Sequence, residues 1–184
     1  MFEWKKFEEV LEIPIRNGLT KPRAIRGNGV KMIAMGELFA KSRIDAMDMD
    51  RVPVSAKELE NCSIKENDLL FARQSLVLEG AGKCSIVTEV TEPTVFESHL
   101  IRVRIDPTKA NPYFMFYYFS SPHGKANIRT IVEQAVQAGI RGSDLIKLSV
   151  PCPDIATQNK IAELLRKFDE KIELNQEVNY NLAA

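Results

Sequence analysis

The sequence contains few of the residues that most often build metal centres, disulfides and acid–base sites. Its 184 residues include 3 cysteines and 2 histidines, and no two cysteines form a Cys-x-x-Cys pair. His99 and His123 are isolated from each other and from the cysteines. Neither a disulfide framework nor a metal-ligand cluster is therefore expected. The cysteines are expected to be buried thiols: Cys62, Cys84 and Cys152.

Long apolar runs are also missing. No segment approaches the roughly 18 apolar residues that a membrane span requires. The first ten residues, MFEWKKFEEV, mix acids and bases without the apolar region of a secretory signal. Hydrophobic residues make up 45% of the chain and charged residues 27%, which is typical of a globular protein. We expect a cytoplasmic protein with no membrane contact and one core domain, with room for one appendage.

Net charge is absent as well, because 25 basic residues balance 25 acidic ones. Such a chain lacks the overall attraction to phosphate on which much non-specific nucleic-acid binding depends. The charge is nevertheless unevenly distributed. Residues 14–43 hold seven basic residues and one acidic, a net +6, and residues 44–68 hold three basic and seven acidic, a net −4. The pattern fits either a basic surface for a partner or charges scattered over a solvated surface.

The middle of the chain has the character of a sheet. Short apolar or alternating runs predict strands at residues 30–35, 69–72, 84–89 and 99–105. Residues 17–29, rich in glycine, predict a loop. With the helices described next, these segments predict a mixed α+β domain with a small mixed sheet.

Helices are expected on both sides of this region. Trp4, Phe7, Val10 and Leu11 recur at helical spacing and predict a helix that stops at Pro14. The aromatic segment 111–120 has a proline in its first turn and predicts a buried helix.

Two shorter helical segments follow. Pro122 is expected to open a helix that runs to about Gln137. Ser143 is expected to cap a short helical turn that reaches Ile146.

The last thirty residues follow a different pattern. After Val150–Pro153, Asp154 or Thr157 can cap a helix of about 45 Å. That length exceeds what the domain can cover, so we expect the helix to project and to pair with another helix; the alternative is an amphipathic helix lying on its own domain. We place the boundary between residues 1–153 and 154–184. The predicted seam advances by alternating steps of four and three residues, the period of a coiled coil: Ile161, Leu165, Phe168, Ile172, Asn175, Asn179 and Leu182.

Little in the sequence indicates catalysis. Asn111-Pro112-Tyr113-Phe114 resembles the N-P-P-Y signature of amino-methyltransferases that act on adenine or cytosine, but the second proline is missing. Such an enzyme also needs a glycine-rich turn between a strand and a helix to hold S-adenosylmethionine. Neither Gly27 nor Gly80 lies in such a turn. An autonomous methyltransferase is therefore the alternative, and a helix start followed by core aromatics is the preferred interpretation of this motif.

Four motifs together resemble the DNA specificity subunit of type I restriction-modification systems. They are N-D-L-L-F-A-R-Q-S-L-V-x-E-G-A-G-K-C-S-I-V, F-E-S-H-L-I-R-V-R, G-I-R-G-S-D-L, and P-x-P-x-x-x-x-Q-x-x-I-A-x-x-L followed by D-E-K-I-E-L-N, and they cover nearly the whole chain. In that family a subunit holds two target recognition domains and two long helices, which pair as an antiparallel coiled coil. This chain has one of each and so resembles a half subunit, completed by a second half or by a second copy in a homodimer.

The resemblance implies a division of labour. The specificity chain is not catalytic and holds no cofactor. Modification subunits carry S-adenosylmethionine and methylate adenine after flipping it from the stack, and a restriction subunit completes the complex. A specificity chain would direct both to one half of a bipartite site in double-stranded DNA. A coiled-coil scaffold that binds DNA without sequence readout is a further alternative.

The residues that would contact DNA fall into two groups. Arg73, Gln74 and Ser75 follow a predicted strand, and arginine and glutamine are planar donors suited to guanine and adenine. Lys83 is expected on phosphate, with Gly80 and Gly82 allowing close backbone approach; the alternative is that Arg73 pairs with Asp68 or Glu79 and shapes the turn. Residues that read bases, or that are merely solvated side chains, are expected in the loops 17–29 and 134–143: Arg23, Arg26, Gln137 and Arg141. Lys21 and Ser143 are further candidates for DNA contact.

Overall fold

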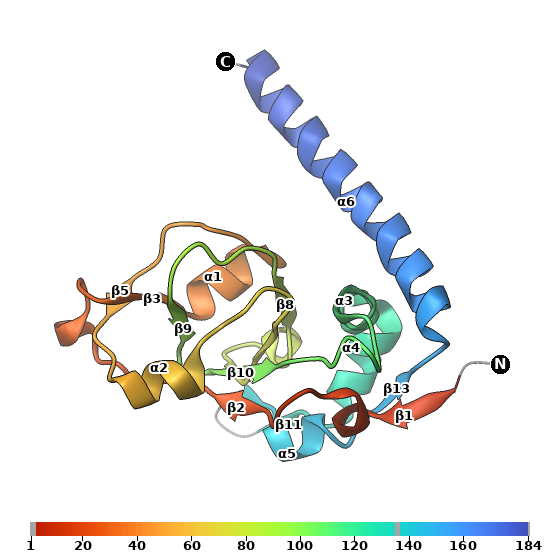
Figure 1. Cartoon of the computed structure of the whole chain (residues 1–184), viewed down its shortest axis with the longest axis horizontal. Helices are drawn as coiled ribbons and strands as arrows, with labels where there is room; N and C mark the ends of the chain where they lie inside the picture. Colours follow the sequence, from red (N-terminus) through yellow and green to blue (C-terminus); the bar gives the residue numbers. More distant parts are fainter. Residues whose placement is uncertain (1–2, 135–136, 184) are drawn as a thin grey trace.

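The computed structural model describes residues 3–134 and 137–183, and Figure 1 shows a mixed α+β domain with a long helix leaving one side, as predicted. The α-helices among these residues are α1 (Met35–Ala40), α2 (Ala56–Cys62), α3 (Pro112–Ser120), α4 (Pro122–Arg129), α5 (Gly142–Leu145) and α6 (Ile155–Ala183). Short 3-10 helices are η1 (Phe7–Val10), η2 (Arg23–Ile25) and η3 (Leu78–Gly80). The strands are β1 (Trp4–Lys6), β2 (Arg16–Asn17), β3 (Val30–Ile33), β4 (Arg43–Ile44), β5 (Arg51–Val52), β6 (Leu69–Ala72), β7 (Gln74–Ser75), β8 (Cys84–Val87), β9 (Thr94–Phe96), β10 (Leu100–Val103), β11 (Glu133–Gln134), β12 (Ala138–Gly139) and β13 (Ser149–Pro151).

A five-stranded sheet forms the centre of the domain, in the order β2-β10-β6-β8-β4. β6 pairs antiparallel with β10 and β8, and β4 runs parallel to β8. Successive residues of a strand point to opposite faces of the sheet. Leu69 and Phe71 of β6 accordingly join one hydrophobic core, and Leu70 and Ala72 join the other. The uninterrupted apolar run in β6 follows from burial on both faces.

The first core lies between this sheet and the helices α3, α4 and the start of α6. The rings of Phe71 and Phe119 meet edge to face with centroids 5.1 Å apart, and Phe7 lies 4.9 Å from Phe119. Asn111 caps α3, because its side-chain oxygen accepts the Phe114 N–H at 3.0 Å. The predicted buried aromatic helix is therefore confirmed.

The second core lies on the opposite face of the sheet, under α1, α2 and a three-stranded sheet in the order β5-β3-β9. Next to it, the fully buried Asp68 accepts two hydrogen bonds from Arg104, both at 2.7 Å. Arg102 is also buried and donates to the backbone oxygen of Ser63 at 3.0 Å. Burial lowers the pKa of Arg102, and the bond to Asp68 raises the pKa of Arg104. These bonds join the end of α2 to the sheet.

The basic and acidic segments of the sequence neutralise part of each other's charge. Glu58 closes a capping box on α2 with Ser55. It also accepts a hydrogen bond from Lys21, which is the main reason that the pKa of Glu58 falls to about 2. Much of the charge asymmetry is therefore satisfied inside the domain. Three ion pairs connect basic residues of 14–43 to acidic residues of 44–68: Lys21–Glu58 at 2.8 Å, Arg26–Asp50 at 2.9 Å and Lys41–Asp45 at 2.7 Å.

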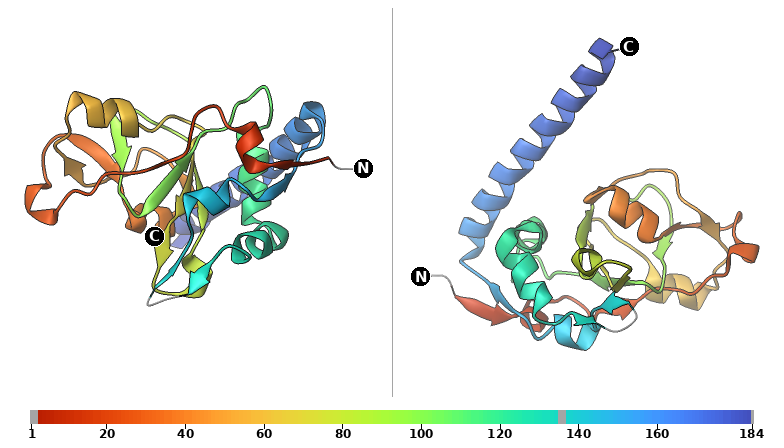
Figure 2. Two further views of the ribbon diagram at one scale, coloured as in Figure 1. Left: turned by 90° about the horizontal axis from the view of Figure 1, so that it is seen from below. Right: turned by 180° about the vertical axis from the view of Figure 1, so that it is seen from behind.

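The helix α6 begins after Asp154, whose carboxylate accepts the Thr157 N–H at 2.9 Å. Its 29 residues extend about 43 Å. Ala162 is buried in the first core and Ile161 packs against it, whereas residues 170–181 are all exposed. Figures 1 and 2 show the second half of α6 standing away from the domain. The predicted projection is confirmed, and the alternative of a helix lying along its own domain is wrong.

The predicted helix at the start of the chain is wrong. Residues Trp4–Lys6 form β1, which pairs antiparallel with β13 so that Trp4 lies opposite Pro151. The following four residues form only a 3-10 turn. Phe7 and Val10 are buried as their spacing suggested, but pairing with a distant strand determines the backbone conformation.

Two further local predictions need correction. The helix that opens at Pro122 ends at Arg129 rather than near Gln137: the Thr130 N–H closes its last turn by donating to the oxygens of Asn127 and Ile128, and Glu133–Gln134 form a strand. Ser143 lies inside α5 and does not cap it: the residue at the cap position is Arg141, which makes no capping bond with its side chain.

The cysteines are free and buried, as expected. Burial raises the pKa of the Cys84 thiol. Within the described ranges, no group of three histidine, cysteine or acidic side chains is placed to hold a metal ion. No helix of the described part of the chain combines the length and the apolar character needed to cross a bilayer.

Candidate nucleic-acid interface

The connection between β6 and β8 is a structured loop, residues 73–83, that is held from two sides. Within it β7 pairs with β12, with Gln74 opposite Gly139, in an outer sheet of order β11-β12-β7. The Arg73 N–H donates to the oxygen of His99 at 2.7 Å, and the Arg73 carbonyl accepts the Ile140 N–H at 2.9 Å. The loop therefore has a defined position relative to the segments around His99 and Ile140.

The glycines of this loop serve the packing of the chain itself. Gly82 has a φ of +74°, which disfavours any side chain, and a Cβ there would lie 2.3 Å from Cγ2 of Ile128. At Gly80 a Cβ would lie 2.2 Å from Oγ of Ser75. The close approach that the sequence suggested is thus made to neighbouring residues of the protein.

A shallow cavity of about 440 Å³, here called the Gln74 hollow, opens beside the first half of the loop. Four separate segments of the chain form it, and its described lining contains amides, a hydroxyl, an imidazole and apolar side chains but no carboxylate. Such a surface can offer hydrogen bonds to base edges and apolar contact between them. Its lining residues are Met35, Phe39, Gln74, Ser75, Leu76, His99 and Gln137.

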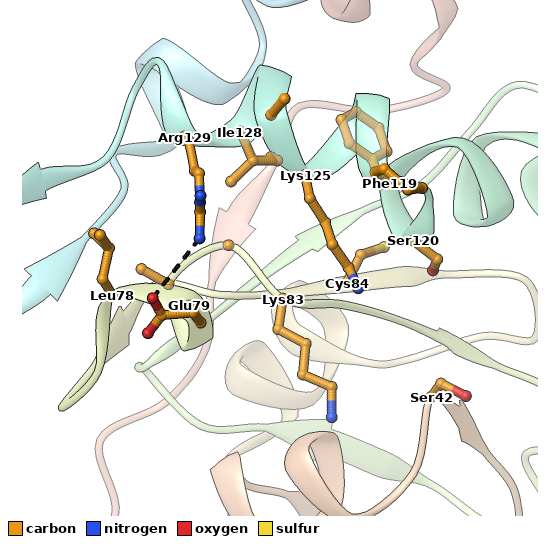
Figure 3. A pocket seen from close by; sticks show the side chains of 14 residues that line it. Ser42, Leu78, Glu79, Lys83, Cys84, Phe119, Ser120, Lys125, Ile128 and Arg129 are labelled. Atoms are coloured by element: carbon orange, nitrogen blue, oxygen red, sulfur yellow. Dashed lines mark ion pairs between the residues drawn. The ribbon is translucent and has the colours of Figure 1, made fainter.

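A larger cavity of about 580 Å³, here called the lysine cleft, opens beside the second half of the loop. Its walls are mostly apolar, with Phe119 and Cys84 among them. Figure 3 shows Lys125 and Arg129 reaching from α4 toward the loop, with Lys83 on the opposite wall. Lys125 and Arg129 are four residues apart and so share one face of α4.

The cations of the lysine cleft are only partly neutralised. Lys83 donates to the backbone oxygen of Phe39 at 2.8 Å and lies 5.0 Å from the centre of its ring. Burial, followed by the nearby charge of Lys125, lowers the pKa of Lys83. Arg129 pairs with Glu79 at 3.7 Å. Phe39 lines the Gln74 hollow and contacts Lys83, so the two cavities adjoin.

The structure gives Arg73 a different partner from those considered in the sequence. Its Nη1 donates to the backbone oxygen of Ser98 at 3.3 Å. The acids proposed as partners are bound elsewhere, Asp68 to Arg104 and Glu79 to Arg129. That alternative is therefore wrong in its partners, although Arg73 does help to shape the turn.

The predicted contact residues divide into two groups. Gln74, Ser75 and Gln137 come together in the Gln74 hollow, and Lys83 lies in the adjoining lysine cleft. Ser75 is itself buried, and its Oγ accepts the N–H of Val77 at 3.2 Å. Ser75 is thus placed to shape the loop.

The remaining candidates are exposed or lie elsewhere. Arg141 is exposed and pairs with Glu133 at 2.8 Å, and Ser143 is exposed on α5. Lys21, Arg23 and Arg26 lie between β2 and β3, at the end of the molecule opposite the base of α6 (Figure 1). The structure does not bring these three to the Gln74 hollow.

Comparison with known proteins assigns the family. The family described as "Type I restriction modification DNA specificity domain" matches residues 1–183. The chain belongs to this family. It is 27% identical over 172 residues to the type I restriction enzyme EcoKI specificity subunit of Escherichia coli K12 and 27% identical over 173 residues to a putative MjaX specificity subunit of Methanocaldococcus jannaschii. These alignments cover 92% and 93% of the chain but 36% and 40% of the relatives.

The fold of the specificity domain also occurs in solved structures. A chain from a structure of a type I restriction-modification system gives a TM-score of 0.70 at 14% identity, covering 96% of this chain and 40% of that one. The S subunit from M. genitalium gives 0.65 at 15% identity, covering 94% and 40%, and the HsdS subunit from Thermoanaerobacter tengcongensis gives 0.65 at 14%, covering 96% and 39%. The chain thus spans roughly two fifths of each of these neighbours.

Several motif residues of this specificity domain have structural roles. Gln158, fully buried, accepts the N–H of Asn111 at 2.9 Å and donates to the oxygen of Pro153 at 2.7 Å. The Asn111 amide caps α3 and also donates to Asn159 at 2.8 Å. Asn111 therefore joins α3 to α6, which explains the N-P-Y-F motif without catalysis.

The predicted seam of α6 changes environment along the helix. Ile161 and Leu165 lie toward the domain and are partly buried, which differs from the expected free seam. Leu182 belongs to α6, but its side chain is outside the described part. The exposed seam residues are Phe168, Ile172, Asn175 and Asn179, and Leu164 lies one turn before Phe168 and is also exposed.

Proposed function

We propose that this chain is one half of a type I specificity subunit, which recognises one half of a bipartite site in double-stranded DNA. The match of the family over residues 1–183 is the observation that carries the proposal. The coverage of about two fifths of each relative fits a unit with one target recognition domain. The domain would comprise residues 1–153 and the coiled-coil spacer residues 154–184.

The reaction itself would belong to partner proteins. Modification subunits would bind S-adenosylmethionine and methylate adenine, and a restriction subunit would cleave the DNA. This chain would be non-catalytic and would position these partners at the target site. Partner subunits can also contribute much of the phosphate neutralisation that a chain of zero net charge lacks. Because its ligand is DNA, the chain would act in the cytoplasm.

The exposed part of α6 would set the distance between two half-sites. A second helix, from a second copy or from a second half of the same subunit, would pack antiparallel against Phe168 and Ile172. Asn175 and Asn179 would favour one register at some loss of stability. A symmetric homodimer would require a palindromic bipartite site.

The Gln74 hollow and the lysine cleft would form the DNA contact. Gln74 and Gln137 offer amides of the kind that pair with adenine. Lys83 and Lys125 offer charges suited to the phosphates, which fix register without reading sequence. Arg141 and Ser143 extend this surface. Lys21, Arg23 and Arg26 would contact DNA only if the duplex reached the far end of the domain.

The experiment that tests this function is methylation of a random DNA library by the chain together with its modification partner. Sequencing the methylated positions should reveal a bipartite motif with a gap of fixed length. The matched variant is Gln137→Ala, which should relax or weaken one position of one half-site and leave the gap unchanged. The control Glu177→Gln, at an exposed position of α6 outside the seam, should leave the motif intact.

The alternatives give different results in the same preparation. A coiled-coil scaffold that binds DNA without sequence readout would lead to methylated positions that share no sequence motif. An autonomous methyltransferase would methylate without a partner, and calorimetry would detect S-adenosylmethionine binding to the chain alone. We expect no such binding.

A further inference from the structure

The tip of the 73–83 loop is apolar and unusually exposed. Leu76 is 88% exposed and Val77 is 59% exposed. Single exposed apolar residues are ordinary on protein surfaces and need no explanation. Here two adjacent ones stand at the end of a loop, between two cavities that carry polar and cationic groups.

The loop presents this tip in a fixed conformation. Gln74 and Ser75 are held by β12, and the Val77 N–H donates to Oγ of Ser75 at 3.2 Å. The Gly80 N–H donates to the oxygen of Val77 at 3.1 Å. The tight fit of Gly80 against Ser75 allows no larger residue there without movement. A preorganised apolar tip loses little conformational entropy when it is buried by a ligand.

The groups on either side of the tip indicate the ligand. On one side the Gln74 hollow offers the amides of Gln74 and Gln137, and its described lining has no carboxylate. On the other side the lysine cleft offers Lys83 and Lys125. Duplex DNA offers a partner for each of these groups: flat apolar base faces inside, acceptors and donors on base edges, and phosphates outside.

We propose that Leu76 and Val77 form an apolar wedge that inserts at a base step of the bound duplex and partly unstacks it, while Lys125 holds a flanking phosphate. This inference rests on the proposed DNA-binding function and adds a mode of contact to it. Insertion of this kind is least costly at flexible pyrimidine–purine steps. The wedge would therefore contribute to specificity at a step that receives no hydrogen bond.

The test uses the chain with its modification partner and the target found in the methylation experiment. A 2-aminopurine placed at each step of the half-site should brighten at one step when wild-type protein binds, because unstacking relieves its quenching. In the double variant Leu76→Ala/Val77→Ala the increase should vanish, and affinity should fall about ten- to a hundredfold. The conservative variant Leu76→Met should keep the fluorescence increase.

Two controls separate the wedge from charge and from general loss of apolar surface. Lys125→Gln should reduce the slope of log affinity against log salt by about one and leave the fluorescence increase in place. Leu174→Ala, at an exposed leucine of α6 outside the seam, should change neither quantity.

The outcomes distinguish this inference from the proposed function. If the wild type selects its target but the double variant brightens 2-aminopurine equally well, the wedge is wrong and the function stands. If the double variant instead loses its modification partner and keeps its DNA response, the tip is a protein contact and the wedge is again wrong. If the wild-type complex selects no DNA, both proposals are wrong.

Discussion

Arg43, in the strand β4 at the edge of the central sheet, lies 3.6 Å from the carboxylate of Asp169 in α6. The same guanidinium lies 3.4 Å from Glu173, one turn further along the helix. The Tyr117 hydroxyl of α3 donates to Asp169 at 2.7 Å. Two elements of the domain therefore hold α6 near its midpoint, at the point where it leaves the surface, and this contact fixes the direction of the projecting part.

Removing the charge of Arg43 should loosen the direction of α6. Two of the Arg43 nitrogens, Nε and Nη1, are buried without a described hydrogen-bond partner, so Arg43→Met should change the free energy of unfolding by no more than about 1 kcal/mol. The distribution of distances between spin labels on Ser42 and Glu177 should broaden. Lys167→Met removes an exposed pair within α6 and should leave the distribution as it is; equal broadening in both variants would contradict the role given to Arg43.

Asp68→Ala should be strongly destabilising. Asp68 is fully buried and holds Arg104 through two bonds of 2.7 Å. Removing one partner leaves a largely buried guanidinium unpaired, which costs about 3–5 kcal/mol. Urea unfolding measures the loss. Glu66→Ala, at an exposed position in the same turn, should stay within about 0.5 kcal/mol of the wild type, and a similar value for Asp68→Ala would show that the pair is dispensable.

The ion pair of Lys21 and Glu58 predicts a dependence of stability on pH. The pKa of Glu58 is lowered from an ordinary 4.5 to about 2, mainly by its bond to Lys21. Its contribution to stability is therefore complete above pH 4.5 and is lost as the pH falls toward 2. The urea midpoints of the wild type and Glu58→Gln should differ more at about pH 5.5 than at about pH 3. Glu60→Gln, at an exposed position of the same helix, serves as the control. A difference between the urea midpoints of the wild type and Glu58→Gln that grows as the pH falls would refute the assignment.

Substitution by alanine should have different effects on stability at two glycines. Gly82 has a φ of +74°, and its Cβ would lie 2.3 Å from Ile128, so Gly82→Ala should cost about 1–3 kcal/mol. Gly36 lies in α1 with open space around it, so Gly36→Ala should be neutral or stabilising by up to about 1 kcal/mol. Thermal unfolding of the two variants compares them directly. A neutral or stabilising effect of Gly82→Ala would mean that the loop can relax around this position.

Shortening α6 should shorten the gap between half-sites. Deleting residues 174–180 removes one heptad, about 10 Å of helix or about three base pairs. The methylated motif should keep its half-sites and lose about three base pairs of gap. An unchanged gap would exclude the exposed helix as the spacer.

Some of the candidate site was accessible from the sequence. Gln74, Ser75 and Lys83 were found because a buried strand ends abruptly in a polar, glycine-containing turn. Met35, Phe39 and His99 were missed as partners of Gln74, because they come from other segments and meet only in the fold. Lys125 and Arg129 left a weak signal, their spacing of four residues on a predicted helix.

The sequence alone determined those helices and strands that are specified by residues close together in the chain. The apolar run of β6, the proline at the start of α3 and the regular seam of α6 each predicted an element correctly, because a strand buried on both faces and a helix are specified by neighbouring residues. Tertiary structure alone decided the fate of Trp4–Lys6, which pairs with β13 against its helical spacing. It also decided which charges neutralise each other and where α6 points. Those outcomes depend on contacts between residues far apart in the chain, which no local pattern encodes.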